Sequence, residues 1–423
     1  MMNNRRDFIK TVSLAAGSMA LSGNMAGCRP GVNPVQGRVS QLSRPTAIAM
    51  WDFSWILRHH RYGSFENWDE VLEGLAERGY DSIRIDCMPQ FVAADSDGIV
   101  QEEFRSVWDK WVMKMWGNDV TMSFRPREAL LEFLPKCREY GIRVGLASWF
   151  MRHNTDRTAI FREEGGLLRA WKETLAFLDQ NGLLDDNIMY VDLLNEYPDW
   201  HGYDWLKEEH MKRTDVKQYQ LDNPDANMPD LDVIPDGRNN PLAKQFYNTY
   251  LNGLIREVKE AFPQCDYFAS ISSSYGHVDM SAFAAIDRHV WFTARIPGAR
   301  DMQKGRVDLD LRELHGKLRR YWDENRKTET DWMNQQITAV ANDARKHNVV
   351  CGNTEGWGSV GWFDHPEVDW RFIKEAAEIS VDLCRKHDNY RFICSSNFTH
   401  PHFRGFWEDI AWHKKITSKI KNE

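Results

Sequence analysis

The chain has 423 residues and a formal net charge of −8 at pH 7, with 62 acidic side chains against 54 lysines and arginines. Residues 1–27 carry a net charge of +2, so a chain that has lost them carries −10. This acidic balance argues against nucleic acids and other polyanions as partners, because binding them requires a surplus of basic side chains.

Residues 1–28 have the layout of an export signal rather than of a folded element. The sequence RRDFIK, which contains Arg5 and Arg6, is similar to a twin-arginine signal, and the stretch before Cys28 is similar to a lipoprotein cleavage site. Its apolar part is too short to cross a bilayer as a mature helix. We therefore expect an exported lipoprotein, anchored to a membrane through a lipid on Cys28, in the periplasm or at the cell surface. The alternative is an ordinary cleaved signal in which Cys28 has no role.

Eight short apolar or β-branched runs follow a linker at residues 29–43. They predict buried strands within one domain over residues 44–423, a length of about 380 residues that is normal for a (β/α)8 barrel with insertions. The runs lie at residues 46–51, 81–87, 142–150, 187–195, 266–272, 289–294, 348–355 and 391–397.

Segments with helical periodicity separate these runs. In residues 67–79 the apolar side chains fall on one face, and Gly79 is expected to end the helix. The fifth helix is expected around residues 279–287. Alternation of strands and helices predicts parallel strands with right-handed crossovers, so the expected fold is α/β, a (β/α)8 TIM barrel. The expected buried face of the helix in residues 67–79 consists of Val71, Leu72, Leu75 and Ala76.

Polar side chains end several of the predicted strands. Asn195 and Glu196 end the fourth strand and start the loop after it, Glu355 ends the seventh, and Arg84 lies in the second. In such a barrel the C-terminal strand ends share one mouth, where strands four and seven face each other. Cleavage of a glycosidic bond needs two carboxyl groups, one to protonate the leaving oxygen and one to attack or to activate water.

This arrangement resembles the clan of retaining (β/α)8 glycoside hydrolases that contains cellulases, mannanases and β-galactosidases. Within the clan, residues 44–423 are most similar to the sugar-binding cellulase-like proteins. The resemblance implies a carbohydrate substrate, no cofactor, Glu196 as acid/base and Glu355 as nucleophile. It also implies that Asn195 binds the sugar 2-hydroxyl and that Arg84 lies near the nucleophile.

A retaining mechanism predicts a specific geometry for the two glutamates. Their carboxyl groups should lie about 5–5.5 Å apart. We expect Glu355 to be ionised because Arg84 lies near it, and Glu196 to hold the proton. Arg84 also has a structural alternative, which is to pair with Asp52 or Asp86.

The chain departs from the clan's pattern at three strand ends. Cellulases of the clan commonly have His after strand three, His-x-Tyr after strand six and Trp after strand eight, where this chain has Ser148-Trp149, residues 293–295 and Asn397-Phe398. His289 begins the sixth predicted strand and would lie at the wrong end of it. Two readings therefore stay open, a retaining hydrolase and a carbohydrate-binding protein that has lost turnover. A metal-dependent barrel hydrolase is a more distant third.

Four tryptophans fall in loops at the predicted mouth, where indole rings can stack on sugars. They are Trp149, Trp200, Trp357 and Trp362, and Asn397 is expected to bind substrate beside them. The alternative for each tryptophan is packing in the core.

Residues 58–61 and 400–402 are rich in histidine but lack the spacing of metal ligands, so no metal site is predicted. We interpret His59 and His402 as hydrogen-bonding or solvated loop residues. The six cysteines after Cys28 show no C-x-x-C spacing and are expected to be mostly buried free thiols. Residues 198–240 are expected to form a long loop beside the cleft, or else a disordered insertion.

Overall fold

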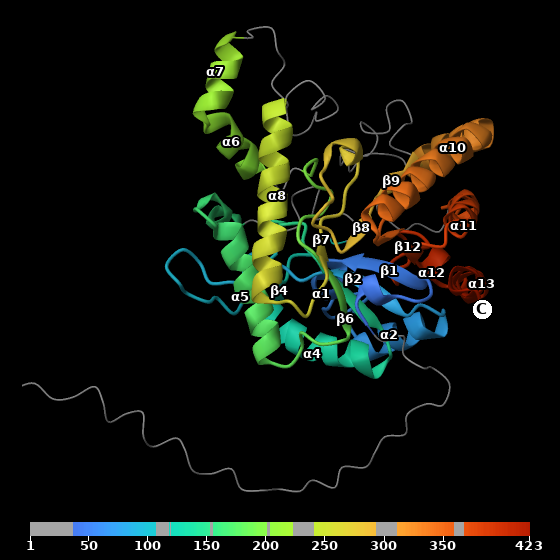
Figure 1. Cartoon of the computed structure of the whole chain (residues 1–423). Coiled ribbons are helices and arrows are strands. Elements are labelled where there is room, and N and C mark those ends of the chain that lie inside the picture. The colour runs from blue at the N-terminus through green and yellow to red at the C-terminus, as the bar shows by residue number, and fades with distance from the viewer. Residues whose placement is uncertain are drawn as a thin grey trace, which may run out of the picture. The chain divides into compact units, whose positions relative to one another are not determined.

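The computed structural model describes residues 37–106, 118, 120–152, 155–200, 204–222, 241–292, 311–358 and 368–423. Eight parallel strands form one sheet, in the order β7-β6-β5-β2-β1-β12-β10-β8. The two edge strands also meet, because the Ala284 N–H donates to the Tyr267 carbonyl (3.0 Å) and the Ile271 N–H donates to the Asp287 carbonyl (3.1 Å). The sheet therefore closes into the predicted (β/α)8 barrel, with helices around it (Figure 1).

Strands and helices alternate along the chain. The barrel strands are β1 (Thr46–Asp52), β2 (Ser82–Asp86), β5 (Arg143–Ala147), β6 (Ile188–Asp192), β7 (Tyr267–Phe268), β8 (Ala285–Asp287), β10 (Val350–Asn353) and β12 (Tyr390–Cys394). The longer helices are α2 (Trp68–Glu77), α4 (Pro126–Glu139), α5 (Gly166–Gln180), α6 (Asp204–Lys212), α7 (Thr214–Asp222), α8 (Pro241–Ala261), α10 (Leu311–His347), α11 (Arg371–Cys384) and α13 (Ile410–Lys421). The shorter elements are η1 (Val39–Gln41), α1 (Ser54–Leu57), α3 (Pro89–Val92), η3 (Arg157–Arg162), η6 (Tyr275–His277), α12 (Arg404–Trp407) and the paired strands β3 (Phe104–Arg105) with β4 (Ser123–Phe124) and β9 (Val290–Trp291) with β11 (Gly356–Trp357).

Helix α2 shows how the local sequence sets the limits of an element. The Asn67 side chain accepts hydrogen bonds from the backbone N–H groups of Asp69 and Glu70, which caps the N-terminus. Gly79 follows the helix with a φ of 82°, as predicted for a glycine at a helix end. Ala76 is exposed, although it was expected on the buried face. The residues that do form this face are Trp68, Val71, Leu72 and Leu75.

The sixth barrel strand differs from its prediction. It is β8, whereas the predicted run at residues 289–294 contributes only β9, which pairs with β11 outside the eight-stranded sheet. Residues 279–287 contain no helix and end in β8 instead. The prediction failed because a three-residue strand shows too little periodicity, and the alanine-rich residues 282–285 favour a helix by composition.

The segment at residues 198–240 is not a plain loop. Its described part contains α6 and α7, while residues 201–203 and 223–240 lie outside the described residues. Trp205 and Leu206 of α6 are buried. At least this part of the insertion is therefore packed and folded, which excludes full disorder.

The prediction that the cysteines are mostly buried free thiols is confirmed. The buried free cysteines are Cys87, Cys137, Cys265, Cys351, Cys384 and Cys394.

The predicted signal, including Cys28, lies outside the described residues. Within the described ranges, no helix is long and apolar enough to span a membrane.

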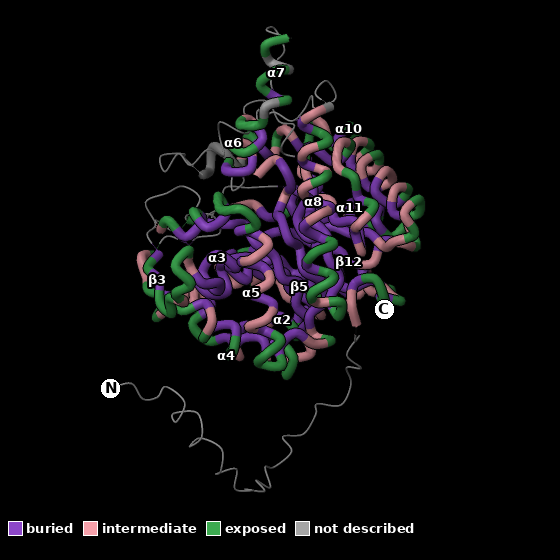
Figure 2. Tube along the Cα trace, turned by 60° about the vertical axis from the view of Figure 1, so that its left-hand side comes forward, coloured by how far each residue is buried: buried purple, intermediate pink, exposed green. Residues whose placement is uncertain are grey.

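Aromatic side chains fill the barrel interior. The ring centroids of Tyr190 and Phe268 lie 4.9 Å apart, and those of Phe268 and Phe392 lie 6.2 Å apart. The neighbouring strand makes room for the tyrosine with a glycine, since a Cβ at Gly145 would lie 2.1 Å from Tyr190 Cζ. Figure 2 shows buried residues concentrated in the barrel and exposed residues on the outer faces of the helices.

The chain leaves four neighbouring strands through residues with left-handed backbone. Asp52, Met88, Phe150 and Glu196 have φ values of 37°, 54°, 51° and 50°. Each ends its strand or follows it within four residues, on β1, β2, β5 and β6 respectively. Residues other than glycine rarely adopt this backbone conformation, so the backbone is locally strained at the mouth of the barrel.

A buried histidine of α13 couples the fold to pH. His413 Nε2 lies 3.0 Å from the Phe406 carbonyl oxygen, and its Nδ1 lies 2.9 Å from the Tyr80 hydroxyl. Burial lowers the pKa of His413 to about 3. The folded chain therefore keeps this side chain neutral at pH values where the unfolded chain protonates it.

The contact between Gly145 and Tyr190 predicts a large effect of a small substitution. Gly145→Ala should lower the free energy of unfolding by about 1–3 kcal/mol, because the added methyl group overlaps the tyrosine ring. Gly253→Ala in α8 is the matched control: its Cβ would meet no atom within 4 Å, and alanine favours a helix by about 0.5–1 kcal/mol. Urea unfolding measures both, and equal stabilities of the two variants would contradict the packing argument.

The neutral state of His413 predicts a loss of stability in acid. The free energy of unfolding should fall as pH falls below about 6.5, by roughly 1.4 kcal/mol per pH unit for this one group, until the folded chain is protonated near pH 3. Urea titrations at pH 7, 6 and 5 measure the slope. The variant His413→Gln should show a smaller slope, and an unchanged slope would show that His413 does not contribute.

Candidate functional site

The carboxyl ends of the strands surround one buried cation, Arg84 of β2. Its Nη1 lies 3.1 Å from Asp52 Oδ1 and contacts Glu355 Oε1, and its Nη2 lies 3.2 Å from Asp192 Oδ2 and contacts the Asn195 side-chain oxygen. Burial alone would lower the pKa of Arg84, but the three carboxylates raise it well above its ordinary value. Arg84 therefore pairs with Asp52, the structural alternative, and also reaches the predicted nucleophile.

Asp86, the other partner considered for Arg84, is engaged elsewhere. Its carboxylate accepts hydrogen bonds from the backbone N–H groups of Met88 (2.8 Å) and Trp149 (3.1 Å). Burial raises the pKa of Asp86 to about 7. Asp86 thus holds the turns that follow β2 and β5.

Glu355 follows β10 and lies inside the mouth, with 1 % of its side chain exposed. Burial raises the pKa of Glu355 to about 8, although the charges of His289 and Arg84 act in the opposite direction. The expectation that Arg84 keeps Glu355 ionised is therefore wrong for the unliganded site, because loss of hydration has the larger effect. Burial also raises the pKa of Asp52, to about 6, and that of Asp192. The carboxyl groups at this site hold their protons more tightly than they would in water.

Glu196 is more exposed to solvent than its neighbour Asn195. Asn195 is buried against Arg84, whereas the Glu196 side chain is 18 % exposed. The Glu196 backbone N–H donates to the Ser270 hydroxyl oxygen (3.1 Å), which holds the strained turn after β6. The pair therefore places an amide in the buried network and a carboxylate at the opening.

His289 lies in the site, contrary to the prediction that it sits at the wrong end of its strand. Because the sixth strand is β8, His289 follows its C-terminal end by two residues. Its Nδ1 lies 3.1 Å from Glu196 Oε1 and 3.6 Å from Glu355 Oε1, and its Nε2 lies 3.1 Å from Thr354 Oγ1. The imidazole therefore stands between the two glutamates that the sequence singled out.

Thr354 and Asp287 orient the His289 ring, and the neighbouring carboxyl groups favour its protonated form. The Thr354 hydroxyl donates to Asp287 Oδ2 (2.6 Å), so it accepts a hydrogen bond from His289 Nε2–H. Burial would lower the pKa of His289, but the charge of Glu355 and contacts with Asp287 and Glu196 raise it well above its ordinary value. The surroundings favour the imidazolium form.

The sequence did contain a signal for His289. Residues 285–287 are a short apolar run that ends in Asp, as the second strand does, and His289 comes two residues later. The order His289-Val290-Trp291 also matches the clan's His-x-Tyr pattern, with Trp291 in place of the tyrosine. The pattern that seemed to be missing is therefore present in part, four residues before the place where it was expected.

The two glutamates and the histidine form one compact group. One donor atom from each of Glu196, His289 and Glu355 lies within 4.8 Å of the other two, a spacing at which the group could hold a metal ion. In the part of the chain that the structure describes, the histidines of residues 58–61 and 400–402 form no such group. His59 instead stacks on the Trp68 ring, with ring centroids 3.8 Å apart, and its Nδ1 lies 2.8 Å from the Phe65 carbonyl oxygen, which agrees with its interpretation as a hydrogen-bonding loop residue.

Asn397 forms hydrogen bonds with the residue that follows Glu355. Its side-chain oxygen accepts a hydrogen bond from the Gly356 N–H (2.7 Å), and its own N–H donates to the Gly356 carbonyl (3.0 Å). Asn397 is fully buried. In this structure it therefore holds the chain directly after Glu355.

The expected aromatic platform is mostly buried. Trp149 and Trp357 are 2 % and 1 % exposed, and the Trp357 indole N–H donates to the Cys394 carbonyl (3.1 Å). Trp200 keeps some exposed surface and packs edge-on against Trp149, with centroids 4.7 Å apart. Trp362 lies outside the described residues. Trp149 and Trp357 thus act as packing residues here, and of the three described indoles only Trp200 remains accessible.

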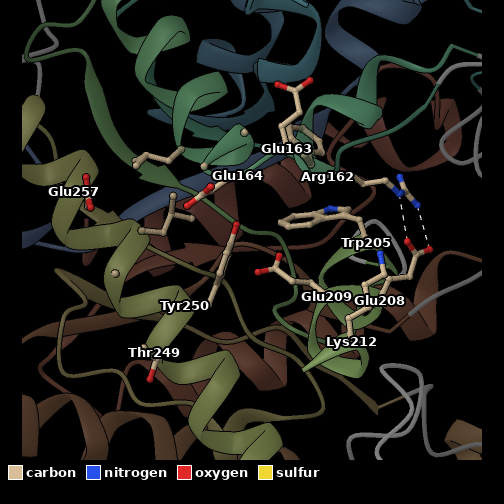
Figure 3. A pocket seen from close by; sticks show the side chains of 16 residues that line it. Arg162, Glu163, Glu164, Trp205, Glu208, Glu209, Lys212, Thr249, Tyr250 and Glu257 are labelled. Carbon is tan, nitrogen blue, oxygen red and sulfur yellow. Dashed lines mark hydrogen bonds and ion pairs between the residues drawn. The ribbon is translucent and has the colours of Figure 1, made fainter. Parts of the chain in front are cut away.

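A large pocket lies away from these residues. It has a volume of about 610 Å³ and is bounded by η3, α5, α6 and α8, with Trp205, Tyr250 and several glutamates pointing into it (Figure 3). Arg162 and Glu208 form an ion pair at its edge (3.2 Å). None of the candidate catalytic residues lines this pocket.

Comparisons with known proteins find solved structures that are similar to this chain. A candidate glycoside hydrolase from Parabacteroides distasonis ATCC 8503 is 27 % identical, with 90 % of this chain and 94 % of that chain covered and a TM-score of 0.69. An endo-1,4-β-D-mannanase from Thermotoga petrophila RKU-1 is 11 % identical (87 % and 99 % covered, TM-score 0.44). A β-1,4-mannanase from the sea hare Aplysia kurodai is 13 % identical (90 % and 95 % covered, TM-score 0.45).

A search of curated proteins finds no match. The sequence profile described as "Cellulase-like: Sugar-binding cellulase-like" matches residues 48–421, which is nearly the whole barrel. The chain therefore belongs to the sugar-binding cellulase-like family.

Proposed function

We propose that the protein is a retaining glycoside hydrolase that acts on a β-linked glycan or glycoside, with Glu196 as acid/base and Glu355 as nucleophile. The observation that carries the proposal is the close approach of the two glutamates, whose nearest donor oxygens lie within 4.8 Å at the mouth of a cellulase-like barrel. Such closeness suits direct attack on the sugar, since an inverting enzyme needs a gap of roughly 6.5–9.5 Å for a water.

The exposure of the two glutamates fits their proposed roles. Glu196 is at the opening, where it can reach the oxygen that leaves with the departing group. Glu355 is buried and contacts Arg84, which fixes the direction of its carboxylate. Attack by Glu355 on the anomeric carbon would form a covalent glycosyl-enzyme, and water activated by Glu196 would then release a product with retained configuration.

His289 provides a path for the proton that Glu355 holds in the unliganded site. Its Nδ1 is within reach of both carboxyl groups, at 3.6 Å from Glu355 Oε1 and 3.1 Å from Glu196 Oε1. The imidazolium of His289 can pass its Nδ1 proton to Glu196 and take up the proton of Glu355 in return. This transfer gives the ionised nucleophile and the protonated acid that the first step requires.

Arg84 and Asn195 are proposed to orient rather than to react. The contact from Arg84 holds the Asn195 side-chain oxygen, and the clan resemblance implies that this amide meets the sugar 2-hydroxyl. Trp200 is the proposed stacking residue, because it alone of the three described mouth indoles keeps exposed surface.

A carbohydrate-binding protein without turnover is the second candidate. Two departures from the clan's pattern favour it: Trp291 stands where the clan has a tyrosine, and Asn397-Phe398 stands where the clan has a tryptophan. A pure binder, however, has no need for two carboxyl groups and a histidine around one bond. Hydrolysis therefore remains the first proposal.

Conservative replacement of each glutamate separates these candidates. On a panel of aryl glycosides and β-glycans, Glu196→Gln should lower kcat/KM by about 10²–10⁴-fold for poor leaving groups and much less for activated ones, because only the former need an acid. Glu355→Gln should be inactive on both. Azide should partly restore Glu196→Ala. Glu164→Gln, on the rim of the pocket in Figure 3, is the control and should match the parent.

The outcomes of this panel discriminate clearly. Retained anomeric configuration in the product supports the proposal, and inversion contradicts it. Glycan binding by the parent without turnover of any substrate would favour the binding protein. Loss of activity in the Glu164→Gln control would move the site to the other pocket.

The proposed location follows from the first 28 residues alone. We propose that the protein is exported by the twin-arginine route and anchored by a lipid on Cys28. Cys28→Ala should then move the protein from the membrane fraction to a soluble pool while its urea unfolding stays unchanged. Replacing Arg5 and Arg6 by Lys should leave folded precursor in the cytoplasm, and normal export of that variant would point to the general secretion route.

A further inference from the structure

The group at the mouth has the composition of a zinc site. We propose that a Zn²⁺ ion binds across Glu196, His289 and Glu355 and blocks hydrolysis, so that zinc is an inhibitor of this protein and not its cofactor. The inhibitory part rests on the proposed function. The binding part rests only on the geometry of three donor atoms that lie within 4.8 Å of one another.

The distances match a tetrahedral ion. Zinc bonds of about 2.0–2.2 Å place neighbouring ligand atoms about 3.3–3.6 Å apart. His289 Nδ1 lies 3.6 Å from Glu355 Oε1, which is within this range, and 3.1 Å from Glu196 Oε1, which is slightly below it. Rotation of the Glu196 side chain, which is partly exposed, can adjust that distance and the separation between the two glutamates. Three protein ligands leave the fourth position open to water.

His289 is held in the orientation that a metal ligand needs. Its Nε2 lies 3.1 Å from Thr354 Oγ1, and the Thr354 hydroxyl donates to Asp287 Oδ2. A ligating histidine characteristically donates its second N–H to a carboxylate, a carbonyl or a water, which fixes the ring. Here a hydroxyl relays that contact to a carboxylate. Nδ1 is thus directed at the two glutamates, and zinc would replace the proton on it.

The charges at the mouth also favour a divalent cation. Five carboxyl groups surround it, and among the side chains named for this site Arg84 is the single permanent cation. Arg84 contacts Glu355 Oε1 and opposes a second cation there, but it is also paired with two aspartates at 3.1 and 3.2 Å, and Glu355 keeps its second carboxyl oxygen. Acidic side chains therefore outnumber the permanent cation, and zinc would displace the protons that they carry. The five carboxyl groups belong to Asp52, Asp192, Glu196, Asp287 and Glu355.

The ligand types select zinc over the common hard cations. An imidazole with two carboxylates and a small coordination number suits Zn²⁺, whereas Mg²⁺ and Ca²⁺ prefer six or more oxygen ligands. The six cysteines in the described ranges are buried and do not compete. Zinc at this site should therefore have only nitrogen and oxygen ligands.

Zinc binding can be measured without any knowledge of the substrate. The folded full-length Cys28→Ala protein, which lacks the one cysteine outside the described ranges, is dialysed against Zn²⁺, and bound metal is measured by atomic absorption. We expect one zinc per chain, no competition by Mg²⁺, and an X-ray absorption spectrum without sulfur ligands. Glu196→Gln, which changes a partly exposed side chain, should weaken binding by at least about tenfold, and His289→Gln by at least as much. His60→Asn is the control and should bind zinc as the parent does.

Different results test the zinc site and its inhibitory role. Unchanged zinc affinity in Glu196→Gln, or sulfur ligands in the spectrum, would overturn the site. If the protein hydrolyses a glycoside, zinc should inhibit competitively and EDTA should restore activity, whereas loss of activity when untreated protein meets EDTA would overturn the inhibitory role. One zinc per chain in the expected pattern without hydrolysis of any glycoside supports the metal site and counts against the proposed function alone. Hydrolysis by a protein that binds no zinc does the reverse.

Discussion

A guanidinium group buried inside the barrel mouth determines how the surrounding residues are placed. An unpaired charge in such a position is strongly destabilising, so Arg84 must be surrounded by anions and hydrogen-bond acceptors. The partners come from β1, β6 and the chain after β10, and the Asn195 amide completes the set. Because Glu355 is one partner and Glu196 adjoins another, the same requirement brings together two residues from strands on opposite sides of the barrel.

The network gathers more acid than base, and this excess explains the protonation of the site. Three buried carboxyl groups, those of Asp52, Asp192 and Glu355, have raised pKa values because burial removes water that Arg84 replaces only in part. The site thus holds protons that the buried His289 can redistribute between the two glutamates. Among the described residues, the His289 imidazole lies within 3.6 Å of both glutamates, and the Thr354 and Asp287 pair accepts its other N–H and fixes the ring.

Periodicity and strand-end residues were enough to predict the barrel and the position of Asn195, Glu196 and Glu355 at its mouth. Seven of the eight strands were recognised because each is a run of apolar residues before polar ones. The strand that was missed is β8, which has only three residues and follows an alanine-rich segment. The composition of this segment favoured a helix, so the next apolar run was predicted as the strand and His289 was placed at the wrong end of it. Because this one strand was misplaced, His289, which lies between the two glutamates, was not predicted as a site residue.

Burial and protonation could not be predicted in the same way. Position in sequence places Trp149 and Trp357 near the mouth, but whether an indole faces solvent depends on contacts with segments far along the chain, such as the Cys394 carbonyl. The pKa of Glu355 likewise depends on how much water the fold removes, which a neighbouring arginine in the sequence pattern does not reveal. The buried contact of Asn397 with Gly356 is of the same kind, since it joins residues 41 positions apart.

The left-handed backbone at the mouth of the barrel lowers stability at a residue that the proposed activity needs. An L-residue in this conformation costs roughly 1–2 kcal/mol that glycine would not, and Glu196 is one of the four residues that adopt it. The residue proposed as acid/base is thus one that the backbone itself disfavours, and a glycine there would relax the strain and remove the chemistry together. Under the proposed function, stability and turnover therefore make opposite demands at this position. Replacement of Glu196 by glycine in another member of the family would relieve the strain and remove the proposed acid/base, so we would not expect that member to hydrolyse glycosides by this mechanism.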